Sequence, residues 1–190
     1  MVENGAVARS ILSVADLKRD ELLALLDKTR RYKASIRKHK ALHVLENRVI
    51  GLLFEKPSTR TRTSFETAVL RLGGEAIYLP TANLQMSRGE PVPDTARVLG
   101  SYLDVLIARV YAEKTLEDFA SYAGIPVINA LSDQEHPTQI ISDLFTIQEA
   151  KGKFENLKLA FIGDGNNVCN SLLFGSALLG MDMTVASPEG

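Results

Sequence analysis

Hydroxyl and guanidinium groups are concentrated at residues 58–62, where the sequence reads Ser-Thr-Arg-Thr-Arg. Serine and threonine hydroxyls donate hydrogen bonds, and an arginine side chain presents a planar fork of N–H groups that matches phosphate oxygens. At the start of a helix, free backbone N–H groups and the helix dipole add to the attraction for an anion. These residue types at this spacing therefore predict an anion site, with phosphate as the expected ligand.

A purely structural interpretation of the same residues is also open. Thr63 and Glu66 have the spacing of a capping box, and many helices begin with serine or threonine without binding a ligand. Spacing alone favours neither interpretation. His136 has a similar ambiguity, because a lone histidine before a proline is more often a hydrogen-bonded loop residue than a catalyst.

The elements that would position these residues follow an α/β pattern. An apolar run at residues 49–54 is typical of a parallel strand buried on both faces, and apolar residues then recur at helical spacing until Gly73. Strands that alternate with helices predict a parallel sheet flanked by helices. The further elements expected in this part are strands at residues 75–79, 105–110 and 126–129 and helices at 14–38, 94–102, 116–122 and 137–150.

Ligands of such sheets bind at the carboxyl ends of the strands. Arg109 is near the end of one expected strand and His136 is in the loop after the next, so both are expected to approach residues 58–61. Residues 80–93 are polar and bounded by prolines, which predicts a long loop, and such loops are often functional.

The last part of the sequence predicts the beginning of a second α/β domain. Strands are expected at residues 157–162 and 181–186, with a helix between them that ends at Leu179. Two strands and one helix are too few to enclose a core. We therefore expect a first domain at residues 1–145 and the start of a second at 146–190.

Composition limits the possible partners. The 190 residues are 45% hydrophobic, enough for a sizeable core, and the net charge of −1 gives no general attraction to nucleic acid or anionic membranes. The single cysteine excludes an internal disulfide framework, and three scattered histidines argue against a metal site. Residues 1–15 have no leader pattern, and no apolar run reaches membrane-spanning length. We expect a soluble cytoplasmic protein whose partner is a small molecule or another protein chain.

Residues 54–66 resemble the carbamoyl-phosphate motif of the aspartate/ornithine carbamoyltransferase family, in which Ser-Thr-Arg-Thr-Arg follows Phe-Glu-Lys-Pro. The His-Pro-x-Gln pattern at 136–139 resembles the second carbamoyl-phosphate motif of the family, and the similarity extends from about residue 10 onward. The resemblance implies a carbamoyltransferase-like fold whose first domain binds carbamoyl phosphate without a cofactor or metal. The residues that it implies for this ligand are Ser58, Thr59, Arg60, Thr61, Gln85, Arg109, His136 and Gln139.

Carbamoyl phosphate is already activated, so its reaction with an amine needs no covalent nucleophile on the protein. Negative charge grows on the carbonyl oxygen during the attack, and we assign Thr61, Arg109 and His136 as the catalytic donors that stabilise it. In the family, the loop that contains Gln85 reaches the site of a neighbouring subunit. The resemblance therefore implies a homo-oligomer built on a trimer.

Residues 163–167, Gly-Asp-Gly-Asn-Asn, resemble the ornithine branch of the family, in which the second asparagine contacts the amino-acid substrate. The aspartate branch has a basic, arginine-containing segment there. Asn167 is thus the expected ornithine ligand, although this asparagine pair could instead cap a helix. The implied reaction transfers the carbamoyl group to the δ-amine of L-ornithine, giving L-citrulline and phosphate, and aspartate or another amine is the alternative acceptor.

Two further alternatives concern the chain as a whole. The later ornithine-binding motifs of the family, an aspartate followed by Ser-Met-Gly and then a His-Cys-Leu-Pro segment, lie beyond Gly190. The chain is therefore expected to be a piece of a longer enzyme or an isolated domain that binds carbamoyl phosphate without completing the reaction. A dinucleotide-binding oxidoreductase module is a weaker alternative, because Gly163-x-Gly165 follows a strand but Val168 occupies the third glycine position.

Overall fold

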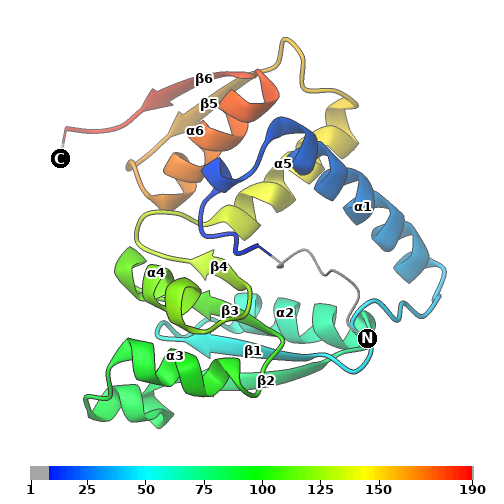
Figure 1. The fold of residues 1–190 in the computed structure, drawn as a ribbon. Helices are drawn as coiled ribbons and strands as arrows, with labels where there is room; N and C mark the ends of the chain where they lie inside the picture. The colour runs from blue at the N-terminus through cyan, green and yellow to red at the C-terminus, as the bar shows by residue number, and fades with distance from the viewer. Residues whose placement is uncertain (1–8, 190) are drawn as a thin grey trace. The chain divides into compact units, whose positions relative to one another are not determined.

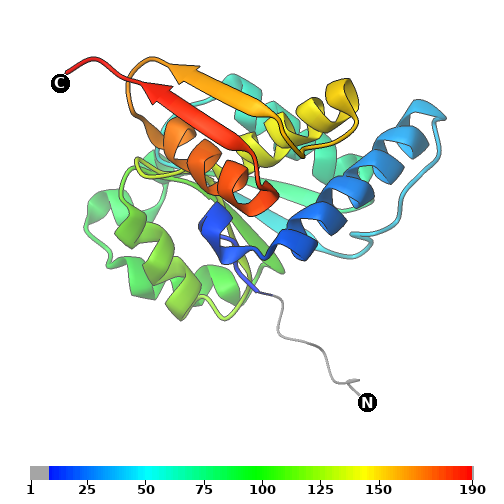
Figure 2. The ribbon, with the colours of Figure 1, turned by 90° about the horizontal axis from the view of Figure 1, so that it is seen from above.

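The computed structural model describes residues 9–189, and its contacts divide them into two compact units. The first unit contains residues 9–12 and 41–129, and the second contains residues 13–40 and 130–189. Figures 1 and 2 show a sheet with its own helices in each unit. The expected boundary at 145/146 falls within a helix that belongs entirely to the second unit. A domain division at that point stays a prediction.

A four-stranded sheet forms the centre of the first unit, with the order β2-β1-β3-β4. β1 pairs in parallel with both β2 and β3, and every residue of β1 after the first is buried. The apolar run that predicted this strand thus reflects a position between two neighbours with helices on the faces. The fold class is confirmed: a parallel sheet flanked by helices. The strands are β1 Val49–Phe54, β2 Glu75–Pro80, β3 Val105–Arg109 and β4 Val127–Leu131.

The helices of the first unit close its core over the middle strands. Leu53, Leu106 and Phe119 are completely buried in one cluster between sheet and helices. The end of α3 lies so close to the end of α4 that a Cβ atom on Gly100 would be 1.8 Å from the carbonyl oxygen of Ala123. The helices are α2 Thr59–Arg71, α3 Val92–Gly100 and α4 Glu113–Tyr122.

Residues 80–93 are more ordered than the expected loop. They contain two short 3-10 helices, η2 Thr81–Asn83 and η3 Gln85–Arg88, and α3 already begins at Val92. Pro91 is the N-cap of α3 and Pro93 follows in its first turn, where a proline costs no helical hydrogen bond. Pro91 and Pro93 therefore mark the start of a helix, whereas Pro80 is the last residue of β2.

The second unit contains a two-stranded parallel sheet, β5 and β6, with helices α5 and α6. Gly175 of α6 packs closely on α5, because a Cβ atom there would be 3.0 Å from Leu144 and 3.1 Å from Ile140. Ile162, at the end of β5, is 84% exposed, so the described residues leave part of this sheet uncovered. The elements are α5 Pro137–Lys151, β5 Lys158–Ile162, α6 Asn167–Leu179 and β6 Asp182–Ala186.

The first helical segment of the second unit is divided, unlike the continuous helix expected at residues 14–38. A 3-10 turn, η1 Val14–Asp16, precedes α1, Arg19–Arg37. Ser13 and Asp16 satisfy each other's backbone N–H groups in a capping box, and Leu17 is extended. This self-contained turn explains why the helix begins later than the apolar pattern predicts.

The part of the chain that the structure describes, residues 9–189, has three general properties that bear on function. Cys169 is a buried free thiol, and three or more histidine, cysteine, aspartate or glutamate side chains do not gather anywhere in this range as a metal-binding group would. Every helix of this range is too short or too polar to cross a bilayer.

Candidate functional site

The turn between β1 and α2 has the form that the hydroxyl cluster predicts. Ser58 is the N-cap of α2: its Oγ accepts a hydrogen bond from the Thr61 backbone N–H at 3.4 Å and donates to Thr61 Oγ1 at 2.9 Å. Thr59 and Arg60 occupy the exposed first turn. Thr63 lies inside the helix, so the alternative in which Thr63 caps it is wrong.

The two arginines of this cluster have different surroundings. Arg62 donates from Nε to Glu66 at 2.9 Å, and its guanidinium lies 3.6 Å from the centre of the Tyr78 ring on β2. The hydrogen bond to Glu66 is the main reason why the pKa of Arg62 is raised. Arg62 thus ties α2 to the sheet, whereas Arg60 is exposed at the helix start. Sequence spacing does not distinguish these two roles.

Arg109 ends β3 beside the end of β1. It is in register with Phe54, and its carbonyl accepts a hydrogen bond from the Glu55 backbone N–H at 2.8 Å. Within the described residues, its buried Nε atom makes no hydrogen bond. Burial lowers the pKa of Arg109, although an arginine side chain keeps its proton in any protein environment. The strand end therefore holds a buried cationic N–H group, Arg109 Nε, that has no acceptor among residues 9–189.

Polar groups at neighbouring strand ends shape this edge, and the sequence analysis assigns no role to any of them, although Glu55 and Lys56 belong to the quoted motif. Glu55 accepts from the Tyr111 backbone N–H at 2.7 Å, Lys56 lies 4.2 Å from the centre of the Tyr111 ring, and Thr81 donates to the Phe54 carbonyl at 3.3 Å. The signal that could have indicated these residues is that they follow directly after a strand. A hollow of about 370 Å³ lies here, lined by Glu55, Thr81, Ala82, Met86, Ser87 and Tyr111.

His136 begins α5 in the second unit. It is the N-cap of that helix, it is half-buried, and its Nδ1 lies 3.5 Å from Thr138 Oγ1. Gln139, one turn into the helix, is exposed and donates to Asp143 at 2.9 Å. Burial raises the pKa of Asp143, and the hydrogen bond from Gln139 opposes that shift. Both predicted side chains thus lie in the first turn of α5.

The asparagine pair at the start of α6 has divided roles. Asn166 caps the helix, because its Oδ1 accepts from the backbone N–H groups of Val168 and Cys169 at 3.0 and 3.1 Å. Asn167 takes no part in the cap and donates from Nδ2 to the Ser132 carbonyl at 2.7 Å. The capping alternative therefore applies to Asn166 and not to Asn167.

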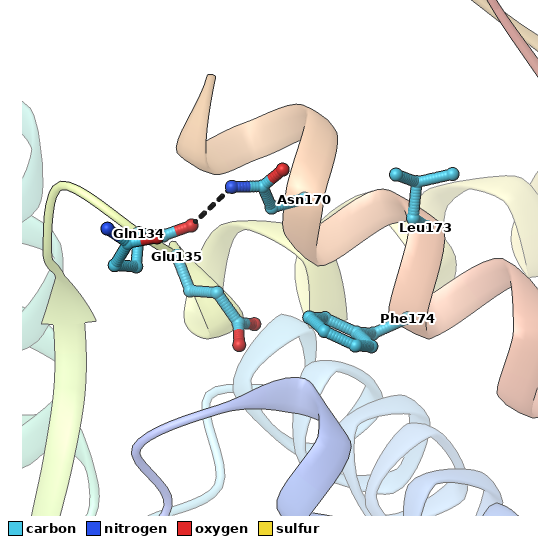
Figure 3. A pocket seen from close by; sticks show the side chains of 5 residues that line it. All are labelled: Gln134, Glu135, Asn170, Leu173 and Phe174. Carbon is cyan, nitrogen blue, oxygen red and sulfur yellow. Dashed lines mark hydrogen bonds between the residues drawn. The ribbon is translucent and has the colours of Figure 1, made fainter. Parts of the chain in front are cut away.

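A second hollow, of about 330 Å³, lies beside the loop that leads into His136. Figure 3 shows the amide of Asn170 directed at Gln134, whose carbonyl accepts its hydrogen bond at 3.0 Å. Leu173 and Phe174 supply an apolar wall, and Glu135 completes the lining. Glu135 is only 7% exposed. Sequence reasoning missed it, because a glutamate in a polar loop gives no pattern that predicts burial.

The predicted site residues thus fall into two groups. The first unit holds one group at the carboxyl edge of its sheet and in η3, and the second unit holds the other at the starts of α5 and α6. The approach of the second group to the first stays a prediction. The first group is Ser58, Thr59, Arg60, Thr61, Gln85 and Arg109, and the second is His136, Gln139 and Asn167.

Comparison with known families gives a match to each part of the chain. The family described as "Aspartate/ornithine carbamoyltransferase, carbamoyl-P binding domain" matches residues 9–149. The family described as "Aspartate/ornithine carbamoyltransferase, Asp/Orn binding domain" matches residues 155–190. The matches together cover nearly all of the described residues.

Individual relatives are similar over almost the whole chain. A protein of Cenarchaeum symbiosum named ornithine carbamoyltransferase is 51% identical over 181 residues, which cover 95% of this chain and 60% of the relative. The structure of ornithine carbamoyltransferase from Pyrococcus furiosus has a TM-score of 0.94 at 45% identity, covering 97% of this chain and 59% of that one. The catalytic subunit of aspartate transcarbamoylase from M. jannaschii has a TM-score of 0.87 at 34% identity, covering 96% and 61%. The chain spans about 60% of the length of the relatives it matches.

Proposed function

The chain belongs to the aspartate/ornithine carbamoyltransferase family, and from this premise we propose that the protein transfers the carbamoyl group of carbamoyl phosphate to the δ-amine of L-ornithine. The products are L-citrulline and phosphate. The ornithine acceptor is favoured over aspartate because relatives about 50% identical are named ornithine carbamoyltransferase, whereas the aspartate transcarbamoylase is 34% identical.

The observation that carries the proposal is the carboxyl edge of the first sheet. Ser58 caps α2 there, Arg60 is exposed in the first helical turn, and the end of β3 presents Arg109 with a buried Nε that has no acceptor in the described chain. A phosphate with a planar carbamoyl group supplies the acceptors that these donors lack. Ser58, Thr59, Arg60 and Thr61 are the proposed phosphate ligands.

The proposed chemistry follows from donors placed around an activated substrate. The neutral δ-nitrogen of ornithine attacks the carbonyl carbon, the new C–N bond forms, and the C–O bond to phosphate breaks. Phosphate leaves with the electron pair of that bond, and the nitrogen loses one proton, for which the leaving phosphate is the available acceptor. Thr61, Arg109 and His136 donate to the carbonyl oxygen as charge grows on it, each worth about 3 kcal/mol if typical. Gln139 orients the carbamoyl amide.

Asn167 is the proposed ligand of the ornithine backbone. Its Nδ2 already donates to Ser132, which fixes the orientation of the amide. The neutral amide suits a zwitterionic amino-acid backbone, because its oxygen accepts from an ammonium group while its nitrogen can donate to a carboxylate. Asp164 three residues earlier adds a negative charge, which disfavours a second carboxylate such as that of aspartate.

The proposal includes an assembly and a setting. A homotrimer would bring Gln85, which is exposed at the start of η3, to the site of a neighbouring subunit. Citrulline formation from ornithine would give the protein a role in arginine biosynthesis. A cytoplasmic location is in keeping with the buried free thiol of Cys169.

The test compares amine acceptors with purified protein and labelled carbamoyl phosphate. Label should pass to ornithine far faster than to aspartate. A preference for aspartate would contradict the ornithine assignment, and carbamoyl-phosphate binding without transfer to any amine would leave only a binding domain.

Asn167→Ala tests the amino-acid site, with Asn170→Ala as its matched control. Each variant removes one hydrogen bond from α6 to the same loop, but only Asn167 is a proposed substrate ligand. Asn167→Ala should lose affinity for ornithine while it keeps affinity for carbamoyl phosphate, and Asn170→Ala should keep both. Equal losses in the two variants would mean that Asn167 acts only through the loop.

A further inference from the structure

One face of α6 holds the loop that leads into His136. Asn167, Asn170 and Ser171 have the i, i+3, i+4 spacing that places side chains on the same helical face. Asn167 donates to the Ser132 carbonyl at 2.7 Å, and Asn170 donates to the Gln134 carbonyl at 3.0 Å (Figure 3). Ser171 continues the series toward the end of the loop.

Ser171 makes two hydrogen bonds in a completely buried position. Its Oγ donates to Glu135 Oε2 at 2.9 Å and accepts from the His136 backbone N–H at 2.9 Å. Both contacts lie within the second unit. The serine therefore connects a buried carboxylate to the main chain of a residue that we assign to catalysis.

Glu135 determines which way the Ser171 hydroxyl points. Its carboxylate receives the Val14 backbone N–H at 3.1 Å and the hydroxyl of Ser13, in addition to Ser171. A carboxylate with three donors around it acts only as an acceptor, so the Ser171 proton must point toward it. The lone pairs of Ser171 are then directed at the His136 N–H. A buried polar network in which each member is satisfied is rigid.

The His136 main chain is held on its other side as well. Its carbonyl accepts from the backbone N–H groups of Gln139 and Ile140 at 3.1 and 3.2 Å, as expected of an N-cap residue. Both polar groups of its backbone are thus bonded. The direction in which the imidazole leaves the chain follows from this fixed backbone.

We propose that Ser171, oriented by Glu135, is a positioning residue that holds His136 in place for carbamoyl transfer. The part of this proposal that concerns catalysis rests on the proposed function, whereas the fixed His136 backbone does not. A displacement of about 1 Å in a catalytic group can lower a rate by about a hundredfold. Loss of the Ser171 hydroxyl should therefore act on kcat before it acts on substrate affinity.

Ser171→Ala is the principal variant, and Ser176→Ala is its control on the same helix. Both serines are buried, but the hydroxyl of Ser176 faces Met183 Sδ at 3.6 Å and touches neither Glu135 nor His136. In assays of the whole protein, Ser171→Ala should lower kcat by about tenfold to a hundredfold with the KM for ornithine within about twofold of wild type. Ser176→Ala should leave both constants unchanged. A rise in KM alone, or equal kcat losses in the two variants, would overturn the proposal.

Glu135→Gln provides a conservative comparison. The glutamine oxygen can accept from Ser171 and Val14, and its nitrogen can donate to the Ser13 hydroxyl, so the network survives with one bond reversed. This variant should retain kcat within about threefold, whereas Glu135→Ala should match Ser171→Ala. A kcat of Glu135→Ala equal to wild type would contradict the orienting role of the carboxylate.

Hydrogen exchange of the His136 amide tests the geometry without any assay of catalysis. In the wild-type chain this amide should exchange about a hundredfold more slowly than in an unstructured chain, although it lies outside the helical ladder. Ser171→Ala should remove most of that protection and Ser176→Ala should not. An unprotected amide in wild type would overturn the proposal even if Ser171→Ala failed to fold. Loss of protection in a protein without transferase activity would instead uphold the positioning and reject only the proposed function.

Discussion

In the first unit, the amino ends of β1 and β3 differ from their carboxyl ends in how the charged side chains are hydrogen-bonded. At the amino end, Asp104 precedes β3 and accepts from the Val49 backbone N–H at 2.8 Å and from Arg48 Nη1 at 2.6 Å. The Asp104 backbone N–H in turn donates to the Val49 carbonyl at 2.9 Å. The charge that begins this strand is thus paired within the protein.

At the carboxyl end, one buried donor is left without an acceptor in the described part of the chain. The buried Nε of Arg109 has no partner among residues 9–189, and Arg60 is exposed in the first turn of α2. Burying a charged donor without an acceptor is unfavourable for folding. The comparison teaches that a paired charge at a strand end contributes to stability, whereas a donor left without an acceptor remains available to a ligand.

Arg109→Met should give the largest effect and the clearest contrast. Loss of a donor to the carbonyl oxygen should lower kcat by about 10²- to 10³-fold. The free energy of unfolding should fall by less than about 0.5 kcal/mol, because the variant also removes a poorly solvated charge. Steady-state kinetics and urea denaturation measure the two quantities.

Arg97→Met is the control for Arg109→Met, since Arg97 is an exposed arginine of α3 paired with Asp94. Its kcat should equal that of wild type. A large loss of stability in Arg109→Met without a loss of kcat would place Arg109 among the structural charges and erase the contrast between the two edges.

Asp104→Ala should show the reverse pattern. The variant loses the acceptor for Val49 and the ion pair with Arg48, which should cost about 1–2 kcal/mol of unfolding free energy at pH 7. Affinity for carbamoyl phosphate should stay unchanged. Circular dichroism in urea is the suitable probe because the chain has no tryptophan. A matching loss of ligand affinity would show that this edge also belongs to the site.

The stabilisation by Asp104 should depend on pH. The backbone hydrogen bond from Val49, and then the Arg48 side chain, lower the pKa of Asp104. A carboxylate with a lowered pKa in the folded state contributes stability above its unfolded pKa of about 3.9, and loses it as pH falls through the folded value. The difference in stability between wild type and Asp104→Ala should therefore shrink below about pH 4. A difference that grows in acid would contradict this assignment.

Arg62→Lys should have the smallest effect. Lysine keeps the charge near Glu66 but loses the planar stacking on Tyr78, and both groups are partly exposed. Affinity for carbamoyl phosphate should remain within about twofold of wild type. A larger loss would mean that Arg62, and not only Arg60, contacts the ligand.

The strength of the local pattern explains how much the sequence could predict. A buried apolar run indicates β1, and hydroxyl residues at one end and glycines at the other indicate the bounds of α2. The sequence therefore predicts both elements within a residue or two of their observed bounds. The spacing of Arg60 and Arg62 does not show that Arg62 is bonded within the protein, because Arg62 contacts Tyr78 on β2, the strand beside β1. Proline signals at residues 80–93 fit either a loop or a helix start, and packing selected the helix.

Long-range polar networks lie beyond sequence patterns of this kind. Glu135 and Ser171 are 36 residues apart, and Ser13 and Glu135 are 122 apart, so no periodicity connects them. Asn166 and Asn167 are equally suited to cap a helix, and only the three-dimensional arrangement assigns the cap to Asn166. The sequence thus predicts which elements carry the candidate residues, whereas the contacts that support these residues become visible only in the fold.

Calorimetric titration of carbamoyl phosphate into wild type, Arg60→Ala and Arg71→Ala tests the central claim most directly. Arg60 lies in the first turn of α2 and Arg71 in the last, so the variants remove the same charge from opposite ends of one helix. Arg60→Ala should weaken binding by about 3 kcal/mol, on the order of a hundredfold in Kd, and Arg71→Ala should leave it unchanged. Unchanged affinity in Arg60→Ala would contradict the placement of the phosphate at the start of this helix.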